Sequence, residues 1–146
     1  MTQQETSQFR RICEQAGLAV THQRQVIYEV LAATDGHPSP EEVYARVRRR
    51  IPAISLATVY KNIHLFIESG IFDQVSMHHG SMRVETNRAP HYHLVCTGCK
   101  SILDMEGGLP GLKEIEERLP RGFRVERLAV DVVGVCEGCQ KQVVVQ

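Results

Sequence analysis

"SLATVYKNIHLFIESG", residues 55–70, has the pattern of a helix with a defined start and a defined end. Ser55 is a favoured N-cap residue, apolar residues follow at helical spacing, and Gly70 is typical of the position just after a helix. The start of this helix offers small, hydroxylic, aromatic and cationic side chains. Such residues suit close approach to a major groove, so we interpret the segment as a candidate DNA-recognition helix.

Three more helices are predicted upstream, each from apolar residues at helical spacing. Ser39, Pro40 and Glu42 form a capping box with proline at the first helical position. Downstream, two short alternating segments joined by "HHG" predict a β-hairpin. Helices followed by such a hairpin indicate a winged helix-turn-helix. The predicted elements are helices at 6–16 (ended by Gly17), 22–34 (capped by Thr21) and 39–50, and strands at 71–77 and 81–86.

The chain changes character near residue 90, where short apolar strands replace helices. We expect an α+β protein made of a winged-helix DNA-binding domain, a hinge and a second domain of strands with one helix. The second domain is small enough to need a metal or a partner subunit. The expected domains are 1–84, hinge 85–89 and 90–146; the second has strands at 91–96, 100–105, 123–135 and 141–145 and a helix at 109–119.

The composition excludes few classes of protein. The 146 residues carry a formal net charge of zero, so total charge does not decide whether nucleic acid is bound. No apolar run is long enough to span a bilayer, and the N-terminus is polar, unlike a signal peptide. A cytoplasmic location is therefore expected.

The candidate DNA contacts lie at the starts of the second and fourth predicted helices of the first domain and at the end of the third. The run "RVRRR" beside the turn suits phosphate neutralisation, although arginines that end a helix also complement its dipole. The predicted DNA-binding residues are Thr21, Arg24, Ser55, Ala57, Thr58, Tyr60 and Lys61, with Arg46, Arg48, Arg49 and Arg50 as candidate phosphate contacts.

Four of the five cysteines form two C-x-x-C pairs, Cys96/Cys99 and Cys136/Cys139. Two such pairs complete a tetrahedral set of four thiolates suited to structural zinc. A redox pair is the alternative, but we expect no helix N-terminus beside either motif to activate a thiol. Cys13 is expected to be an ordinary residue of the first helix.

Two histidines precede the first cysteine pair on the same predicted strand. Because side chains alternate along a strand, His91 and His93 point to one face and Cys96 to the other, so they should belong to separate sites. If Thr97-Gly98 is a two-residue turn, His91 lies opposite Asp104 and His93 opposite Ile102. Asp104 then joins the histidine face.

Two imidazoles and a carboxylate suit Fe(II), Mn(II) or Zn(II), but further ligands must come from elsewhere in the chain. His37, in the turn before a capped helix, and Glu85, at the hinge, are candidates. The remaining histidines are assigned packing or solvated roles; they are His22, His64, His78 and His79.

Several motifs together resemble the ferric uptake regulator family, most closely its peroxide-stress branch. They are "THQRQVIYEVL", "GHPSPEEVYARV", "ISLATVYKNIHLFIESGIF", "HYHLVCTGC" and "GVCEGC", which occur in family order and cover nearly the whole chain. The resemblance implies that the second domain is a C-terminal α/β dimerisation domain holding a four-cysteine structural zinc. It also implies a regulatory Fe(II) or Mn(II) between the domains. The implied ligands of that ion are His37, Glu85, His91, His93 and Asp104.

The chain departs from the iron-uptake branch at three positions. Pro90 and Tyr92 stand where H-H-D-H is usual, and Arg127 stands where a histidine is often found. A further metal site at those positions is therefore not expected. Glu85 is one methylene longer than the aspartate more usual in the peroxide branch.

The resemblance implies a homodimeric repressor of a palindromic, A/T-rich operator, not an enzyme. Peroxide would act through iron-catalysed oxidation of a ligand histidine, His37 or His91. The alternatives are an iron- or manganese-uptake regulator of the same family, a metal-dependent hydrolase or oxygenase, and a zinc-stabilised RNA-binding or scaffold protein.

Overall fold

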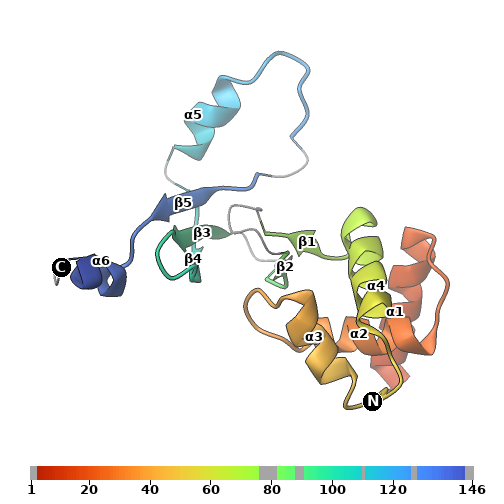
Figure 1. Ribbon diagram of the computed structural model, residues 1–146. Helices are drawn as coiled ribbons and strands as arrows, with labels where there is room; N and C mark the ends of the chain where they lie inside the picture. Colours follow the sequence, from red (N-terminus) through yellow and green to blue (C-terminus); the bar gives the residue numbers. More distant parts are fainter. Residues whose placement is uncertain (1–2, 76–81, 88–90, 110, 126–127, 144–146) are drawn as a thin grey trace. The chain divides into compact units, whose positions relative to one another are not determined.

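A computed structural model describes residues 3–75, 82–87, 91–109, 111–125 and 128–143. The chain divides into two compact units, Met1–Asn87 and Arg88–Gln146 (Figure 1). The predicted wing tip with His78 and His79, and also Pro90 and Arg127, lie outside the described residues. Within the described ranges, no helix is long and apolar enough to cross a membrane.

The first unit contains four helices and a short hairpin, as expected for a winged helix-turn-helix. The predicted caps of its second, third and fourth helices are all formed: Thr21, Ser39 and Ser55 each accept the backbone N–H of the residue three positions on. The Ser39–Glu42 capping box is complete. The elements are α1 (Gln3–Ala16), α2 (His22–Ala32), α3 (Pro40–Val47), α4 (Leu56–Glu68), β1 (Asp73–Gln74) and β2 (Val84–Glu85).

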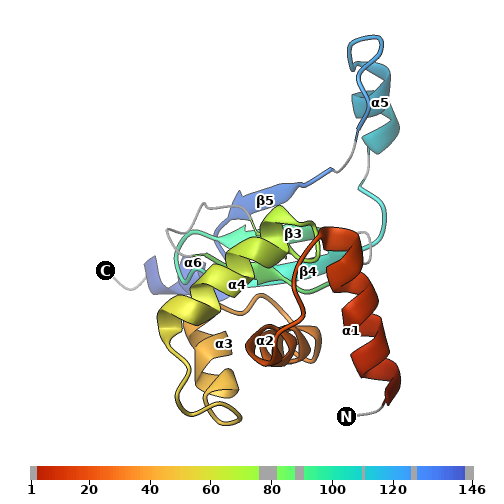
Figure 2. The same cartoon turned by 90° about the vertical axis from the view of Figure 1, so that its right-hand side faces the viewer.

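The apolar faces of these helices form one core, with α2, α3 and α4 packed on one another and α1 alongside (Figure 2). Tyr28 lies at its aromatic centre, with its ring centroid 5.1 Å from that of Phe9 and 6.2 Å from that of Phe66. Val59, Ile63 and Phe66 of α4 are fully buried. The opposite face of α4 is therefore left for solvent or for a ligand.

The second unit is built on a three-stranded sheet in the order β4-β3-β5. Strand β4 pairs antiparallel with β3, whereas β5 pairs parallel with it after a long connection. The elements are β3 (His91–Cys96), β4 (Ile102–Glu106), α5 (Leu112–Glu117), β5 (Asp131–Gly134) and α6 (Glu137–Val143).

The predicted register of the β3–β4 hairpin is wrong by two residues. His93, not His91, is opposite Asp104, and His91 is opposite Glu106. The reason is the turn: Cys96 N–H bonds to Ser101 O at 3.0 Å, so four residues and not two connect the strands. Because a shift of two preserves which face each side chain occupies, Asp104 still lies on the histidine face.

The end of the chain is also different from the prediction. The strand expected at 141–145 is absent up to residue 143, where helix α6 is found instead, and β5 covers only Asp131–Gly134 of the predicted 123–135. The apolar run "VVV" suggested a strand, but Cys136 and Cys139 must turn back toward the first cysteine pair. A helical turn does this, since Gln140 N–H bonds to Cys136 O at 3.0 Å.

Candidate metal centres

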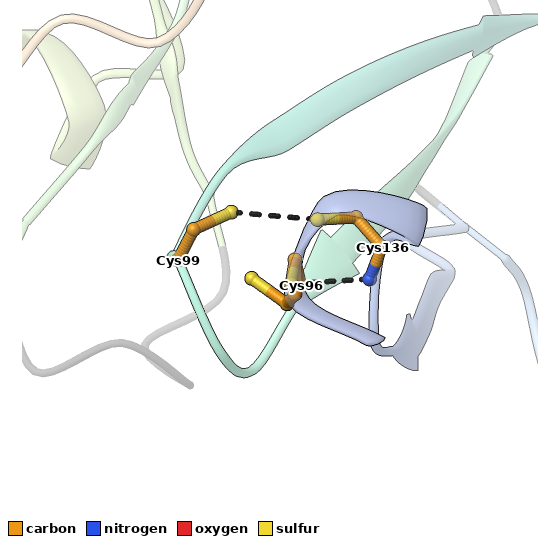
Figure 3. Close-up of side chains that lie close together, drawn as sticks. Cys96, Cys99 and Cys136 are labelled. Carbon is orange, nitrogen blue, oxygen red and sulfur yellow. Dashed lines mark hydrogen bonds between the residues drawn. The ribbon is translucent and has the colours of Figure 1, made fainter. Parts of the chain in front are cut away.

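The four paired cysteines gather at one end of the second unit. Their sulfur atoms all lie within 4.8 Å of one another, and those of Cys99 and Cys136 are 3.8 Å apart (Figure 3). Tetrahedral zinc with Zn–S bonds of about 2.3 Å requires sulfur atoms separated by about 3.8 Å. The cluster therefore fits a structural zinc ion.

A backbone hydrogen bond favours the thiolate form of Cys96, which is the form that binds a cation. The Cys136 N–H donates to the sulfur of Cys96 at 3.3 Å and lowers the pKa of that thiol to about 6. Hydrogen bonds with the side chains of Cys136 and Cys96 raise the pKa of Cys139 to about 12, because they favour its protonated thiol. A zinc ion among the four sulfur atoms would supply the positive charge that favours the thiolate form of each ligand.

Gly98 makes the close approach of the two cysteine pairs possible. A side-chain carbon at this position would lie 2.8 Å from the sulfur of Cys139. The C-x-G-C pattern showed this glycine, but only the meeting of distant segments reveals its steric role.

The expectation that neither cysteine pair adjoins a helix start is wrong, because Cys136 directly precedes α6. The position of the cysteines relative to helices therefore does not exclude a redox role. The convergence of all four sulfur atoms, which a redox pair does not need, favours zinc instead.

The second cluster lies on the opposite face of the same sheet. The Nε2 atoms of His91 and His93 are 3.0 Å apart, and Asp104 Oδ1 lies 3.7 and 3.5 Å from them. Ligands that share one coordination sphere with bonds of about 2.1 Å lie about 3 Å apart. Two imidazoles and a carboxylate converging on one side are the donor set of Fe(II) and Mn(II) sites.

His93 has a further partner that sequence reasoning missed. Its Nδ1 atom lies 3.2 Å from Asp131 Oδ1, because the parallel β3–β5 pairing sets His93 opposite Asp131. Nothing local in the sequence marks Asp131, since 38 residues separate it from His93.

The other two predicted ligands are adjacent in the first unit. His37 Nε2 lies 3.2 Å from Glu85 Oε2, although 48 positions of sequence separate them. The structure therefore brings His37 and Glu85 together, and it brings His91, His93 and Asp104 together in the second unit.

Hydrogen bonds from β2 and the residues beside it hold the His37 turn in place. Val84 N–H donates to Pro38 O at 3.0 Å, and Thr86 Oγ1 donates to Gly36 O at 2.8 Å. Asn87 N–H donates to Glu85 Oε1 at 2.7 Å and so orients that carboxylate. These hydrogen bonds hold both His37 and Glu85 in position.

Arg83 connects this pair to the helix-turn-helix. Its guanidinium donates to His37 O at 3.3 Å and to the Glu42 carboxylate at 3.2 Å. Glu42 is the capping residue of α3, so one side chain links the His37 turn to the start of that helix. Sequence reasoning missed Arg83 as well.

Several predicted DNA contacts have structural partners in this unit. The Arg24 guanidinium donates to Asn62 Oδ1 of α4 at 3.0 Å, while Thr21 and Ser55 act as N-caps. Ala57 and Lys61 are exposed on α4. The DNA-contact assignments remain predictions.

Tyr60 of α4 bonds to α3. Its hydroxyl donates to Glu41 Oε1 at 2.5 Å, and this bond lowers the pKa of Glu41 and raises the pKa of Tyr60. A phosphate at this position would have to displace the carboxylate.

Comparison with known proteins gives consistent matches. The model of the "Ferric uptake regulator family" matches residues 15–133. The chain is 31% identical over 144 residues to the peroxide operon regulator of Bacillus subtilis, with 97% of this chain and 98% of that protein covered. It is 35% identical over 128 residues to the peroxide-responsive repressor PerR of Staphylococcus aureus, with 86% and 85% covered.

A solved structure agrees with the fold. The Campylobacter jejuni peroxide stress regulator aligns with a TM-score of 0.66 and 27% identity over 95% of this chain and all of that one (100%). The expected α+β class and the expected family resemblance are thereby confirmed.

We predict that Cys136→Ser abolishes stoichiometric zinc binding, because three thiolates no longer complete the tetrahedral set. Metal analysis after gel filtration measures the bound zinc, and hydrogen exchange measures the loss of protection in β3 and β5. Cys13→Ala, in the core of the first unit, is the control and should retain zinc. Full zinc in Cys136→Ser would contradict the assignment.

Proposed function

Because the chain belongs to the ferric uptake regulator family of metal-responsive regulators, we propose that it is a dimeric, metal-dependent repressor that responds to peroxide. The observation that carries the proposal is the convergence of His91, His93 and Asp104 on one side of the sheet. The names of the relatives from B. subtilis, S. aureus and C. jejuni support the peroxide response.

The proposed regulatory ligands are those that the family resemblance implies. His37 and Glu85 would act with His91, His93 and Asp104 on one Fe(II) or Mn(II) ion, giving three nitrogen and two oxygen donors. The pairing of His37 with Glu85 supports this, because two ligands from distant positions are already adjacent in their own unit.

Ligands from both units would make the angle between the units depend on metal. In a dimer, this angle sets the separation of two recognition helices, which must match two half-sites on DNA. Without a cation, the carboxylates of Glu85 and Asp104 would repel each other. Metal affinity and operator affinity are then reciprocally linked. The hydrogen bonds of Arg83 to Glu42 and to the His37 turn support this linkage within the first unit.

The proposed operator contact is the N-terminal part of α4. Ala57 and Lys61 are exposed there, and the buried opposite face holds the helix rigidly on the core. A palindromic, A/T-rich duplex is the proposed DNA partner, since a two-fold symmetric dimer requires a symmetric site.

The proposed response to peroxide is oxidation of a ligand histidine, His37 or His91. An Fe(II) ion held by these ligands would catalyse the two-electron oxidation of the ring by hydrogen peroxide, a redox reactivity that Mn(II) lacks. One oxygen atom of hydrogen peroxide is inserted into a C–H bond of the imidazole, and the other leaves as water. The oxidised ring is a poorer ligand, so the arrangement that fits the operator is lost.

The proposed dimer uses the sheet face opposite the histidines. Leu103 is 60% exposed and Val132 47% exposed, and both flank Leu94 in the same row of the sheet. Exposed apolar rows of this kind mark protein interfaces, and a second copy of the chain is the occupant that fits a family of DNA-binding dimers.

Metal should increase operator affinity in the wild type. We expect Mn(II) to strengthen binding to a palindromic A/T-rich duplex by about 5- to 150-fold, the usual range of such coupling. Fluorescence anisotropy measures it. His37→Ala and His91→Ala should lose the metal effect, whereas His22→Ala, at a histidine outside the proposed site, should keep it. Equal affinity with and without Mn(II) in the wild type would refute metal-dependent repression.

Peroxide should modify only the iron-loaded protein. After anaerobic Fe(II) loading and a peroxide pulse, mass spectrometry should find one added oxygen atom on the peptide containing His37 or His91. The Mn(II)-loaded protein is the control and should be unmodified. Unmodified histidines together with intact operator binding would favour an iron- or manganese-uptake regulator instead.

Leu103→Asp should convert the protein into a monomer, because a charge cannot be buried in an apolar interface without a partner. Sedimentation velocity measures the change, and retained zinc shows that the unit is folded. Val20→Asp, at an exposed apolar position of the first unit, is the matched control and should remain dimeric. A dimeric Leu103→Asp variant would place the interface elsewhere.

A further inference from the structure

A row of three ionisable side chains crosses the sheet of the second unit. Asp104 on β4 and Asp131 on β5 are each opposite His93 on the central strand β3. His93 lies in the middle, with its side chain 13% exposed, and that of Asp131 is 12% exposed. The two carboxylates meet the histidine at different ring atoms, which gives them different roles.

The geometry points to Asp131 as a positioning residue that holds the proton of His93 on Nδ1. A neutral imidazole carries one N–H and one lone pair, on opposite sides of the ring. Asp131 Oδ1 is 3.2 Å from Nδ1 and accepts a hydrogen bond there. The lone pair is then on Nε2, which faces His91 and Asp104.

Backbone hydrogen bonds hold Asp131 beside His93. His93 N–H donates to Val130 O at 3.1 Å, which fixes the strand carrying Asp131 beside β3. The parallel register continues to Cys96 and Gly134, where Thr97 N–H bonds to Gly134 O at 2.8 Å. The cysteine cluster beyond this point holds the two strands together.

Asp131 is placed to orient a ligand and not to be one. The candidate ligand atoms meet on the Nε2 side of His93, and Asp131 is on the other side of the ring. A carboxylate on the second nitrogen of a metal-binding histidine fixes the tautomer and makes the ring a stronger donor. Without it, the Nε2–H tautomer would compete, and its proton would occupy the position that a cation needs.

This inference rests on the proposed function, because it assigns Asp131 to the regulatory metal site. The test therefore has one readout that involves Mn(II) and one that does not. Zinc-loaded protein is used throughout, and unchanged zinc content shows that each variant is folded.

The first readout is the tautomer of His93, observed by ¹⁵N–¹H correlation of the histidine rings without added Mn(II), with His93→Gln used for assignment. We expect Nδ1–H in the wild type and a shift toward Nε2–H in Asp131→Ala. Asp131→Asn, which keeps a neutral acceptor, should lie between them. An unchanged tautomer in Asp131→Ala overturns the inference, even if Mn(II) binds more weakly, because Asp131 would then act otherwise.

The second readout is Mn(II) affinity by calorimetry. Asp131→Ala should weaken it by about 10- to 100-fold, the usual effect of removing such a partner. Glu106→Gln, which removes an exposed carboxylate from the same sheet, controls for charge alone and should have a smaller effect. Equal affinity in Asp131→Ala and the wild type overturns the inference. If the wild type and His91→Ala bind Mn(II) equally, the proposed function fails instead, and the tautomer readout still decides the role of Asp131.

Discussion

The position of β3 at the centre of its sheet is the constraint from which both candidate metal centres of the second unit arise. An antiparallel neighbour supplies Asp104 to His93 on one side, and a parallel neighbour supplies Asp131 on the other. The same parallel pairing carries the chain to Cys136 beside Cys96. A shift in either pairing would remove a ligand or a positioning contact.

The two faces of this sheet differ in polarity because side chains alternate along each strand. The row containing His93 holds polar groups, whereas the next row, with Leu94 between Leu103 and Val132, is apolar. A strand of six residues therefore separates a charged face, the candidate metal-binding face, from an apolar face that carries the proposed dimer contact. The cysteines lie at its end, where the connecting turn leaves room for them.

In the first unit, the His37–Glu85 pair depends on the short hairpin as much as on the helices. Strand β2 bonds to the turn that carries His37, and Arg83 joins the same turn to the capping residue of α3. Short polar contacts thus connect this pair to the helix-turn-helix. Helix α4, whose other face is the proposed DNA-binding surface, packs on the same core.

The sequence by itself determined the features that depend on near neighbours in the chain. The helix caps, the paired cysteines and the alternation of histidines and cysteines follow from local spacing, and the structure bears them out. The motif resemblance identifies the family and implies His37 and Glu85 as ligands, for which local spacing alone gives no geometric argument. The hairpin register was wrong because it depended on an assumed turn length, yet an even shift preserved the face of Asp104.

Only the tertiary structure decided the contacts between distant segments. Asp131 joins His93 through a parallel pairing that has no local signal, Arg83 reaches a turn 46 positions away, and Gly98 is needed because Cys139 packs against it. The terminal helix replaced a predicted strand for a related reason, since the last cysteine pair must face the first. These features are set by long-range strand pairing and close packing, which short-range patterns of residues do not specify.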